Sequence, residues 1–378
     1  MLLAAAVAGL LTAPGAAATA WTVVPTPNPG TSNTLGGLVR FGTGDVWAVG
    51  QASSPSYAGC HGRTLTLRYN GSAFVEVPDT HTAICATVDG VGGTGPSDIW
   101  AVGSAGNGRD THLRHWDGSG WTVVSGATIT PPPPGRAQRS TGLNAVAART
   151  PSDVWAVGRA EYADFSRSAL IEHFDGAAWS LKAAAGGTGS VLDGVVALAA
   201  NEAWAVGRAA GGSGTVTLVE RWNGSAWTAV PSPNASVQNA LHGVAGTSGD
   251  LWAVGEATKS FTDGVSTTRT LIEHWDGTAW TRVPSPNVGA GNNALSGVVA
   301  RGAADVWAVG YDDDVTGDIP VRKTLTLHWN GSRWSVVASP NAGSGDNWLS
   351  DAVSASGTAG QVFANGNSAA GTLVERFG

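Results

Sequence analysis

The chain has 378 residues, with 54 glycines, 18 prolines and 17 tryptophans, and only 13% of its residues are charged. Its formal net charge is −7, and it shows no basic patch that could displace counterions from a phosphate backbone, which excludes nucleic acid as a partner. Short runs of valine, tryptophan, threonine and leucine alternate with glycine-rich turns, and no long stretch has helical apolar periodicity. This composition predicts an all-β protein.

The first segment, residues 1–20, has the form of a secretory signal peptide. An apolar stretch is followed by small residues that end in Ala-Thr-Ala at 18–20, the pattern of an A-x-A cleavage site. Pro14 and Gly15 interrupt the apolar run, which disfavours a membrane anchor, and no later run is long enough to span a bilayer. We therefore expect a secreted protein without a membrane span and with one mature domain, residues 21–378.

A hexapeptide recurs along the rest of the chain. The copies are DVWAVG (45–50), DIWAVG (98–103), DVWAVG (153–158), EAWAVG (202–207), DLWAVG (250–255), DVWAVG (305–310) and a degraded QVFANG (361–366). The spacing between their aromatic residues runs from 48 (204 to 252) to 56 (307 to 363). Self-similarity at this period indicates a solenoid or a propeller.

Each unit contains four runs with the character of a β-strand. They are of the types ALSGVVA (294–300), DVWAVG (305–310), TLIEHWDG (270–277) and AWTRVPSPN (279–287). Asn-Gly or Asp-Gly separates the third run from the fourth, and this dipeptide predicts a hairpin with a type I′ turn. Four antiparallel strands repeated seven times predict a seven-bladed β-propeller, with the repeated tryptophans in its core.

The two ends of the chain complement each other. The last unit stops at its third run, TLVERFG (372–378), whereas the sequence after the leader begins with the fourth run, AWTVVPTPN (20–28). We expect residues 21–28 to pair with residues 372–378 and to close the ring. Closure removes an open blade edge, whose unpaired backbone groups would favour aggregation.

These units resemble those of secreted bacterial kelch-like or galactose-oxidase-like propellers, built on repeats of the form DVWAVG…HWDGTAW…VPSPN. The resemblance covers essentially residues 21–378 and implies the propeller fold. Propellers serve as oxidases, sialidases, lectins and scaffolds alike, so the resemblance identifies no functional residue.

The loops between second and third strands differ most between units, and in a propeller they lie on one face with the loops that lead to the next blade. Variable loops on a rigid scaffold are where function usually resides. Aromatic and polar side chains in these loops suit the apolar faces and hydroxyl groups of sugars. The expected ligand contacts there are Tyr57, His61, Arg109, Asp110, Tyr162, Phe165, Phe261, Tyr311 and Asp313.

Trp348 is the one tryptophan outside the repeat positions. It precedes the first strand of the last unit, where other units carry smaller residues such as Thr34 and Gly142. We expect Trp348 either to contact a ligand at the mouth of the central channel or to cover the seam at which QVFANG has lost its tryptophan.

The two cysteines, Cys60 and Cys85, fall on the same face in neighbouring units. In an exported protein such a pair predicts a disulfide, and no Cys/His cluster suits zinc. The prolines at 131–134 form a stiff insertion that serves either as a spacer or as a docking arm.

The acidic run at 311–318 offers oxygen ligands for calcium at Asp312, Asp314 and Asp318, with a solvated loop as the alternative. Otherwise we expect no cofactor and no metal. A third-strand position alternates His and Arg, as at His274 and Arg221, which favours a contact at a blade edge over a metal ligand.

No catalytic motif is found whose structural context fits. We therefore predict a secreted, non-catalytic and monomeric recognition protein. It would be lectin-like and bind a glycan or cell-surface polymer through its loop-rich face. The alternatives are a scaffold for another secreted protein, and a galactose-oxidase-like or lyase-type enzyme.

Overall fold

A computed structural model describes residues 20–42, 44–53, 62–78, 85–106, 108–127, 138–262, 265–317, 319–354 and 361–378. For residues 260–262 and 265 only the backbone is described. No helix in the described part of the chain is long and apolar enough to cross a membrane.

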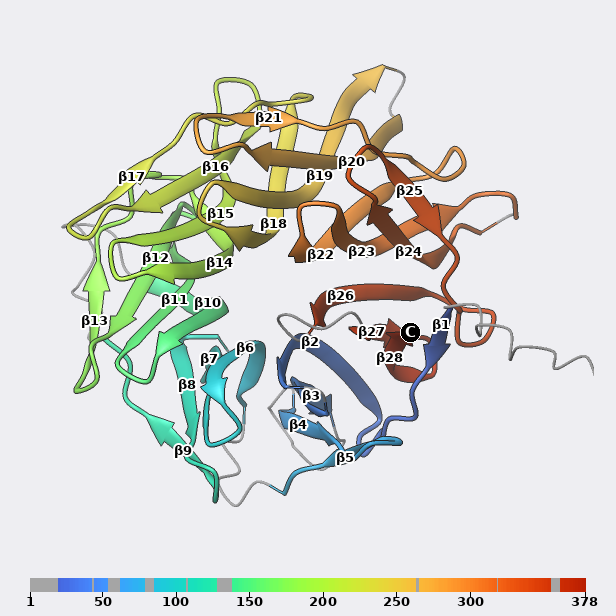
Figure 1. Cartoon of the computed structure of the whole chain (residues 1–378). Coiled ribbons are helices and arrows are strands. Elements are labelled where there is room, and N and C mark those ends of the chain that lie inside the picture. The colour runs from blue at the N-terminus through green and yellow to red at the C-terminus, as the bar shows by residue number, and fades with distance from the viewer. Residues whose placement is uncertain are drawn as a thin grey trace, which may run out of the picture.

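The described residues form seven blades of four antiparallel strands arranged around a central axis, as the sequence predicts (Figure 1). The strands of blades 1 to 3 are β2 (Ser32–Phe41), β3 (Asp45–Ser53), β4 (Arg63–Tyr69) and β5 (Phe74–Glu76); β6 (Thr87–Gly95), β7 (Asp98–Ala105), β8 (Asp110–Trp116) and β9 (Trp121–Val124); β10 (Gln138–Thr150), β11 (Asp153–Tyr162), β12 (Arg167–Phe174) and β13 (Trp179–Lys182).

The strands of blades 4 to 7 are β14 (Val191–Ala199), β15 (Glu202–Ala210), β16 (Thr215–Trp222) and β17 (Trp227–Ala229); β18 (Gln238–Thr247), β19 (Asp250–Thr262), β20 (Val265–Trp275) and β21 (Trp280–Arg282); β22 (Asn293–Gly302), β23 (Asp305–Asp314), β24 (Val321–Trp329) and β25 (Trp334–Val337); β26 (Asn347–Ser354), β27 (Val362–Ser368), β28 (Gly371–Phe377) and β1 (Trp21–Val23). A parallel backbone bridge between Thr215 and Gln238 joins the sheets of blades 4 and 5.

The ring closes in blade 7, where the predicted pairing of the two chain ends is confirmed. In β1 and β28, Trp21 lies opposite Phe377 and Val23 opposite Glu375. Asn28 Oδ1 accepts a hydrogen bond of 2.8 Å from the backbone N–H of Thr372. The same Asn-to-Thr bond recurs within blades 4, 5 and 6, in the pairs Asn234–Thr217, Asn287–Thr270 and Asn341–Thr324. The N-terminal strand therefore makes the contacts of an ordinary fourth strand.

Aromatic side chains hold neighbouring blades together, which confirms that the repeated tryptophans are core residues. The second-strand Trp155 packs against Trp222 and Trp227 of the next blade, with ring centroids 4.9 and 5.1 Å apart. Between blades 6 and 7, Trp307 packs against Trp21 and Phe377. Trp21 therefore completes an interface between blades as well as a sheet.

The degraded copy in blade 7 is matched by changes in blade 1. Phe363, which replaces the second-strand tryptophan, packs against Tyr69 and Phe74 at 5.3 and 6.5 Å. Asn367 Oδ1 accepts a hydrogen bond from the backbone N–H of Leu35 at 2.9 Å, and Asn365 donates to the carbonyl of Gly37 at 3.3 Å. Smaller rings and polar side chains thus join the first and last blades.

The turns between third and fourth strands differ from the predicted type I′ turn. Trp222 pairs with Trp227, so four residues form the loop, and in Asn223-Gly224 only the glycine has a positive φ, of 95°. Asn223 Oδ1 accepts hydrogen bonds from the backbone N–H groups of Ser225 (2.9 Å) and Ala226 (3.0 Å). The asparagine is therefore selected as a side-chain acceptor that caps the loop.

The third-strand position that alternates His and Arg contacts a carboxylate of its own blade where the residue is histidine. His274 Nε2 lies 2.7 Å from Asp250 Oδ1, and its ring stacks on Trp252 at 4.4 Å. Arg68 and Arg221 pair with the equivalent carboxylate and lie over the equivalent indole. Arg376 instead donates a hydrogen bond of 3.1 Å to the hydroxyl of Tyr69 in blade 1.

Candidate functional site

The first strand of each blade carries a β-bulge at one fixed position. In β14, Leu192 lies opposite Gly207 and Gly194 opposite Val206, which leaves Asp193 without a backbone partner. A bulge redirects the extra residue out of the regular alternation. We call the seven bulged residues the channel ring: Gly36, Asp89, Asn144, Asp193, His242, Ser296 and Ser350.

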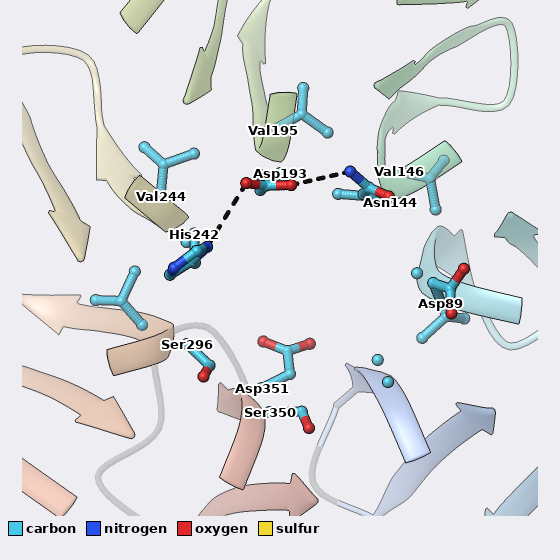
Figure 2. A pocket seen from close by; sticks show the side chains of 18 residues that line it. Asp89, Asn144, Val146, Asp193, Val195, His242, Val244, Ser296, Ser350 and Asp351 are labelled. Carbon is cyan, nitrogen blue, oxygen red and sulfur yellow. Dashed lines mark hydrogen bonds and ion pairs between the residues drawn. The ribbon is translucent and has the colours of Figure 1, made fainter. Parts of the chain in front are cut away.

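A cavity of about 360 Å³ lies on the axis of the propeller. All of its described lining residues belong to the seven first strands, and the channel ring is part of the lining. Figure 2 shows these side chains around the opening, with Asn144, Asp193 and His242 linked along one side and Asp89 and Asp351 elsewhere on the rim.

A second ring of side chains stands one level further out. It consists of the residues that directly follow the WAVG motif or its equivalent, and we call it the mouth ring: Gln51, Ser104, Arg159, Arg208, Glu256, Tyr311 and Asn367. Three of these residues contact the channel ring of their own blade. The pairs are Arg159 with Asn144 (3.2 Å), Arg208 with Asp193 (2.8 Å) and Glu256 with His242 (3.9 Å).

Polar contacts run through blades 3, 4 and 5. Asn144 Nδ2 donates to Asp193 Oδ1 at 2.9 Å, and Asp193 Oδ2 lies 3.6 Å from His242 Nδ1 (Figure 2). Asp193 is therefore shared between an amide, the Arg208 guanidinium and an imidazole. These contacts fix the orientation of the side chains before any ligand arrives.

His242 is held as a cation. Burial by itself lowers the pKa of its imidazole, but the carboxylates of Asp193 and Glu256 outweigh burial and raise this pKa to about 9. The nearby His242 imidazole in turn lowers the pKa of Glu256. At neutral pH the ring nitrogens are donors, so His242 does not serve as a general base there.

Two carboxyls of the lining are only weakly compensated. Asp89 is open to the water of the channel but enclosed by the surrounding blades, and this desolvation raises its pKa to about 6. Desolvation also raises the pKa of Asp351 to about 6, although its carboxylate accepts hydrogen bonds from the backbone of Leu38 and Ala352. The residue that follows the bulge is glycine or alanine in the other six blades, whereas in blade 7 it is Asp351, which faces blade 1.

The cavity is therefore lined by both hydrogen-bond donors and hydrogen-bond acceptors. Ser296 and Ser350 add hydroxyl groups that make no side-chain hydrogen bond within the described residues, and Gly36 leaves a gap without a side chain. Such an arrangement suits a small ligand, or the end of a larger one, that carries several hydroxyl or amide groups.

Tyr311 and Asp313 lie near the cavity without lining it. The Arg322 guanidinium stacks on the Tyr311 ring at 4.2 Å and lies 3.4 Å from Asp313 Oδ1. Burial raises the pKa of the Tyr311 hydroxyl, and Glu256 acts in the same direction. Tyr311 belongs to the mouth ring, so one expected contact residue stands at the entrance of the channel.

Trp348 stands at the level of the mouth ring, because its Cα partner in the sheet is Asn367. Its side chain is half-buried. Both expectations for Trp348 therefore remain predictions: it lies at the channel entrance and also beside the seam between blades 7 and 1.

The other expected contact residues are spread around the face. Phe165 is 70% exposed at a hairpin tip in blade 3, where Arg139 covers its ring at 4.5 Å, and Tyr162 ends β11. Arg109 and Asp110 are exposed at the start of β8. None of these four residues lines the cavity.

Several expected sites fall outside the described part of the chain. Tyr57, Cys60 and His61 do so, as do the 131–134 segment and Asp318, and the Phe261 side chain is not described. The disulfide of Cys60 with Cys85 therefore stays a prediction.

The described part of the chain holds no group of three His, Cys, Asp or Glu side chains placed to bind a metal. At the expected calcium run, Asp314 Oδ1 already accepts hydrogen bonds from the backbone and hydroxyl of Thr316. Burial, together with the neighbouring carboxylates, raises the pKa of Asp312 to about 6.

The channel ring was missed by sequence reasoning, although a signal for it exists. In first strands of the form Leu-x-Gly-Val, such as LDGV (192–195) and LHGV (241–244), the second position varies among polar residues inside an otherwise apolar run. A polar residue with no fixed identity in a core strand indicates a position that faces water or a ligand.

Comparisons with known proteins support the fold. No protein-family model and no curated protein matches the chain. Solved structures with a similar fold include two of YCF48 and one of an ulvan lyase. YCF48 bound to a D1 peptide has a TM-score of 0.56 at 14% identity, covering 94% of this chain and 96% of that one. YCF48 from Cyanidioschyzon merolae has a TM-score of 0.53 at 14% identity, with 95% and 98% covered.

The third similar structure is an ulvan lyase of polysaccharide lyase family PL25. Its TM-score is 0.53 at 10% identity, and 80% of each chain is covered. Identities this low show a shared β-propeller fold alone. The expected resemblance to kelch-like or galactose-oxidase-like propellers is therefore confirmed for the architecture and not for those families.

Proposed function

We propose that the protein is a secreted, non-catalytic, lectin-like recognition propeller that binds a glycan through its loop-rich face. The observation that carries the proposal is the channel ring, in which six of the seven bulged residues direct a side chain into one axial cavity. Carboxylates accept hydrogen bonds from sugar hydroxyls, while Asn144, His242 and the serines donate them. Tyr311 and Trp348 at the entrance supply apolar surface for a sugar ring.

Electrostatics favours recognition over catalysis. His242 is kept protonated by Asp193 and Glu256, and Asp193 is bound by Arg208 and Asn144. Groups that are satisfied in this way orient a ligand well but exchange protons poorly near neutral pH. A binding role therefore fits the Asn144, Asp193 and His242 side of the channel ring better than the lyase-type or oxidase-type alternatives.

The test is a glycan array with the purified protein, followed by calorimetric titration of any glycan that binds. Ser296→Trp places a large side chain in the cavity and should abolish binding. Ala177→Trp, in an exposed hairpin on the opposite face, is the matched control and should leave the dissociation constant unchanged. Trp348→Ala should weaken binding if that side chain contacts the sugar. The proposal fails if no glycan binds, or if Ser296→Trp binds as well as Ala177→Trp.

A peptide is the second candidate ligand. The observation that favours it is the structure of YCF48, a propeller of similar fold, bound to a D1 peptide. A peptide would use the same cavity and the surrounding loops, and the protein would act as a scaffold for another secreted protein. An empty glycan array together with a co-purifying protein that is lost in Ser296→Trp would support this alternative.

The remaining parts of the proposal concern processing and assembly. We propose that residues 1–20 are cleaved on export and that residues 21–378 act as a monomer. We also propose that Cys60 and Cys85 form a disulfide. Mass spectrometry of the secreted protein, before and after reduction, measures the N-terminus and the disulfide together.

A further inference from the structure

A cleft on blade 5 gathers positive charge in a chain of net charge −7. It lies between β19, β20 and β21 and the segment that joins blade 4 to blade 5, and its volume is about 260 Å³. Lys259, Arg269 and Arg282 line it, together with Ser236 and Ser285, and none of its described lining residues is acidic.

Blade 1 shows what two of these positions do elsewhere in the ring. Counted from the aromatic residues that end the third strand and begin the fourth, Arg63 and Glu76 correspond to Arg269 and Arg282. In blade 1 this pair is an ion pair of 2.6 Å. In blade 5 the acidic partner is replaced by a second arginine, so two like charges stand where blade 1 forms an ion pair.

The cations of the cleft are not compensated by the described residues. Neither Lys259 nor Arg282 contacts a carboxylate within the described part of the chain, and both are exposed. Glu273 is opposite Arg282 in the sheet, but it is fully buried and makes no hydrogen bond. Burial raises the pKa of Glu273 to about 8, so it is mainly neutral at pH 7.

Arg269 is held in place by backbone carbonyls. Its Nη1 donates to Gly291 O at 2.5 Å and its Nη2 to Ala290 O at 3.4 Å. A guanidinium fixed by neutral acceptors keeps its full charge and loses little conformational freedom when an anion binds.

We propose that this blade 5 cleft binds an oxyanion, namely a sulfate, phosphate or carboxylate group of a larger ligand. Lys259, Arg269 and Arg282 supply the charge, and the hydroxyl of Ser236 is a further donor. Planar guanidinium groups match the oxygens of such anions. If the glycan proposed above reaches the cleft from the channel face, its acidic groups bind here, although the cleft does not depend on that proposal.

The experiment is calorimetric titration of the purified full chain with inorganic sulfate, inorganic phosphate and glucuronate in separate arms, against a chloride background of constant ionic strength. Arg282→Glu recreates the ion pair of blade 1 and should weaken binding of the preferred anion by about tenfold or more. Arg333→Glu, an equal charge change in an exposed hairpin of blade 6, is the control and should keep the affinity of the unaltered chain.

The three arms distinguish the sources of the oxyanion. Saturable binding in one arm that is lost in Arg282→Glu supports the proposal and names the group. No saturable binding in any arm, or equal weakening by Arg333→Glu, overturns it. Circular dichroism shows whether Arg282→Glu is folded, and Lys259→Gln, at an exposed position, gives a second variant that should also weaken binding. If Arg282→Glu still binds a neutral glycan, the channel site is intact, and the loss of anion binding is then specific to the blade 5 cleft.

Discussion

One position of the third strand holds a buried glutamate in four blades. Whether this glutamate stabilises the fold depends on the hydrogen-bond donors that its carboxyl group finds. The four residues are Glu172, Glu220, Glu273 and Glu375. Glu220 accepts hydrogen bonds of 2.9 Å from the backbone N–H groups of Ala185 and Gly186, which follow the fourth strand of the preceding blade. Glu273 has no such partner.

The missing donor is explained by proline. Ala185 stands six residues after Trp179, and the equivalent residue before blade 5 is Pro233, six after Trp227. Proline has no N–H group to donate. Blades 1, 6 and 7 also follow a proline at this position. The glutamate is replaced by Leu67 in blade 1 and Leu327 in blade 6, whereas Glu375 of blade 7, like Glu273, is buried without a hydrogen bond in the described part of the chain.

Glu273→Leu should therefore stabilise the protein, most strongly at alkaline pH. The pKa of Glu273 is about 8 in the folded chain against a usual value of 4.5. Folding thus retains a proton that the unfolded chain releases, and stability is lost as pH rises from about 4.5 to about 8. The cost at pH 7 is on the order of 3 kcal/mol. Urea unfolding at pH 5 and pH 8 should show a gain that grows with pH.

Glu220→Leu is the matched control for this prediction. It leaves the N–H groups of Ala185 and Gly186 unpaired and should destabilise the chain by about 1–3 kcal/mol. If Glu273→Leu is destabilising at pH 8, or as costly as Glu220→Leu, the explanation through proline is wrong.

At the scale of elements, the bulge in each first strand lies beside the glycine that ends WAVG, or its equivalent, in the second strand. A Cβ on Gly207 would lie 2.0 Å from the carbonyl oxygen of Val191. The same glycine recurs in all seven blades with an equally close carbonyl, from Gly50 in blade 1 to Gly366 in blade 7. The close approach lets the first strand shift its register and direct Asp193 into the channel.

Gly207→Ala should consequently destabilise the protein by about 2 kcal/mol or more, since backbone has to move to admit a methyl group. Gly212→Ala, in an exposed turn of the same blade where a Cβ has no neighbour within 4 Å, should change the free energy of unfolding by less than about 0.5 kcal/mol. Equal effects of the two substitutions in chemical denaturation would contradict the assigned role of Gly207.

The elements show where sequence reasoning succeeds and fails. The DVWAVG and AWT segments predicted the second and fourth strands because their residue types recur with few changes. The fourth strands are shorter than predicted, since β21 ends at Arg282 before the VPSPN segment. The turn at Asn223-Gly224 was assigned the wrong type because the dipeptide does not reveal that the asparagine acts through its side chain. The channel ring was missed because a bulge depends on the contact between two strands, and the variable residue at 193 or 242 carries no motif.

At the scale of the whole molecule, ring closure combines a sheet and an interface. The N-terminal strand contributes Trp21 to the contact of blade 7 with Trp307 and contributes Asn28 to the loop at Thr372. Closure was predictable because the chain ends on one run of the repeat and the described part begins with the next. The position of the ligand face was predicted only in outline, since loop variability does not reveal which side chains converge on the axis.

A chain that starts at residue 29 should be much less stable than one that starts at residue 21. It loses the burial of Trp21 and the backbone pairing of β1, and we expect its melting temperature to fall by about 10 °C or more. Differential scanning calorimetry of the two chains is the measurement. Coincident melting transitions would show that the N-terminal strand does not close the ring.

The account as a whole depends on the channel ring being the place where the ligand binds. The most direct test is to record the imidazole resonances of the histidines by NMR while the glycan identified on the array is titrated to saturation. We predict that the His242 resonances shift in proportion to the bound fraction, while those of His115, His173, His274 and His328, which are engaged within their own blades, stay in place. Saturation of binding with unchanged His242 resonances would contradict the account.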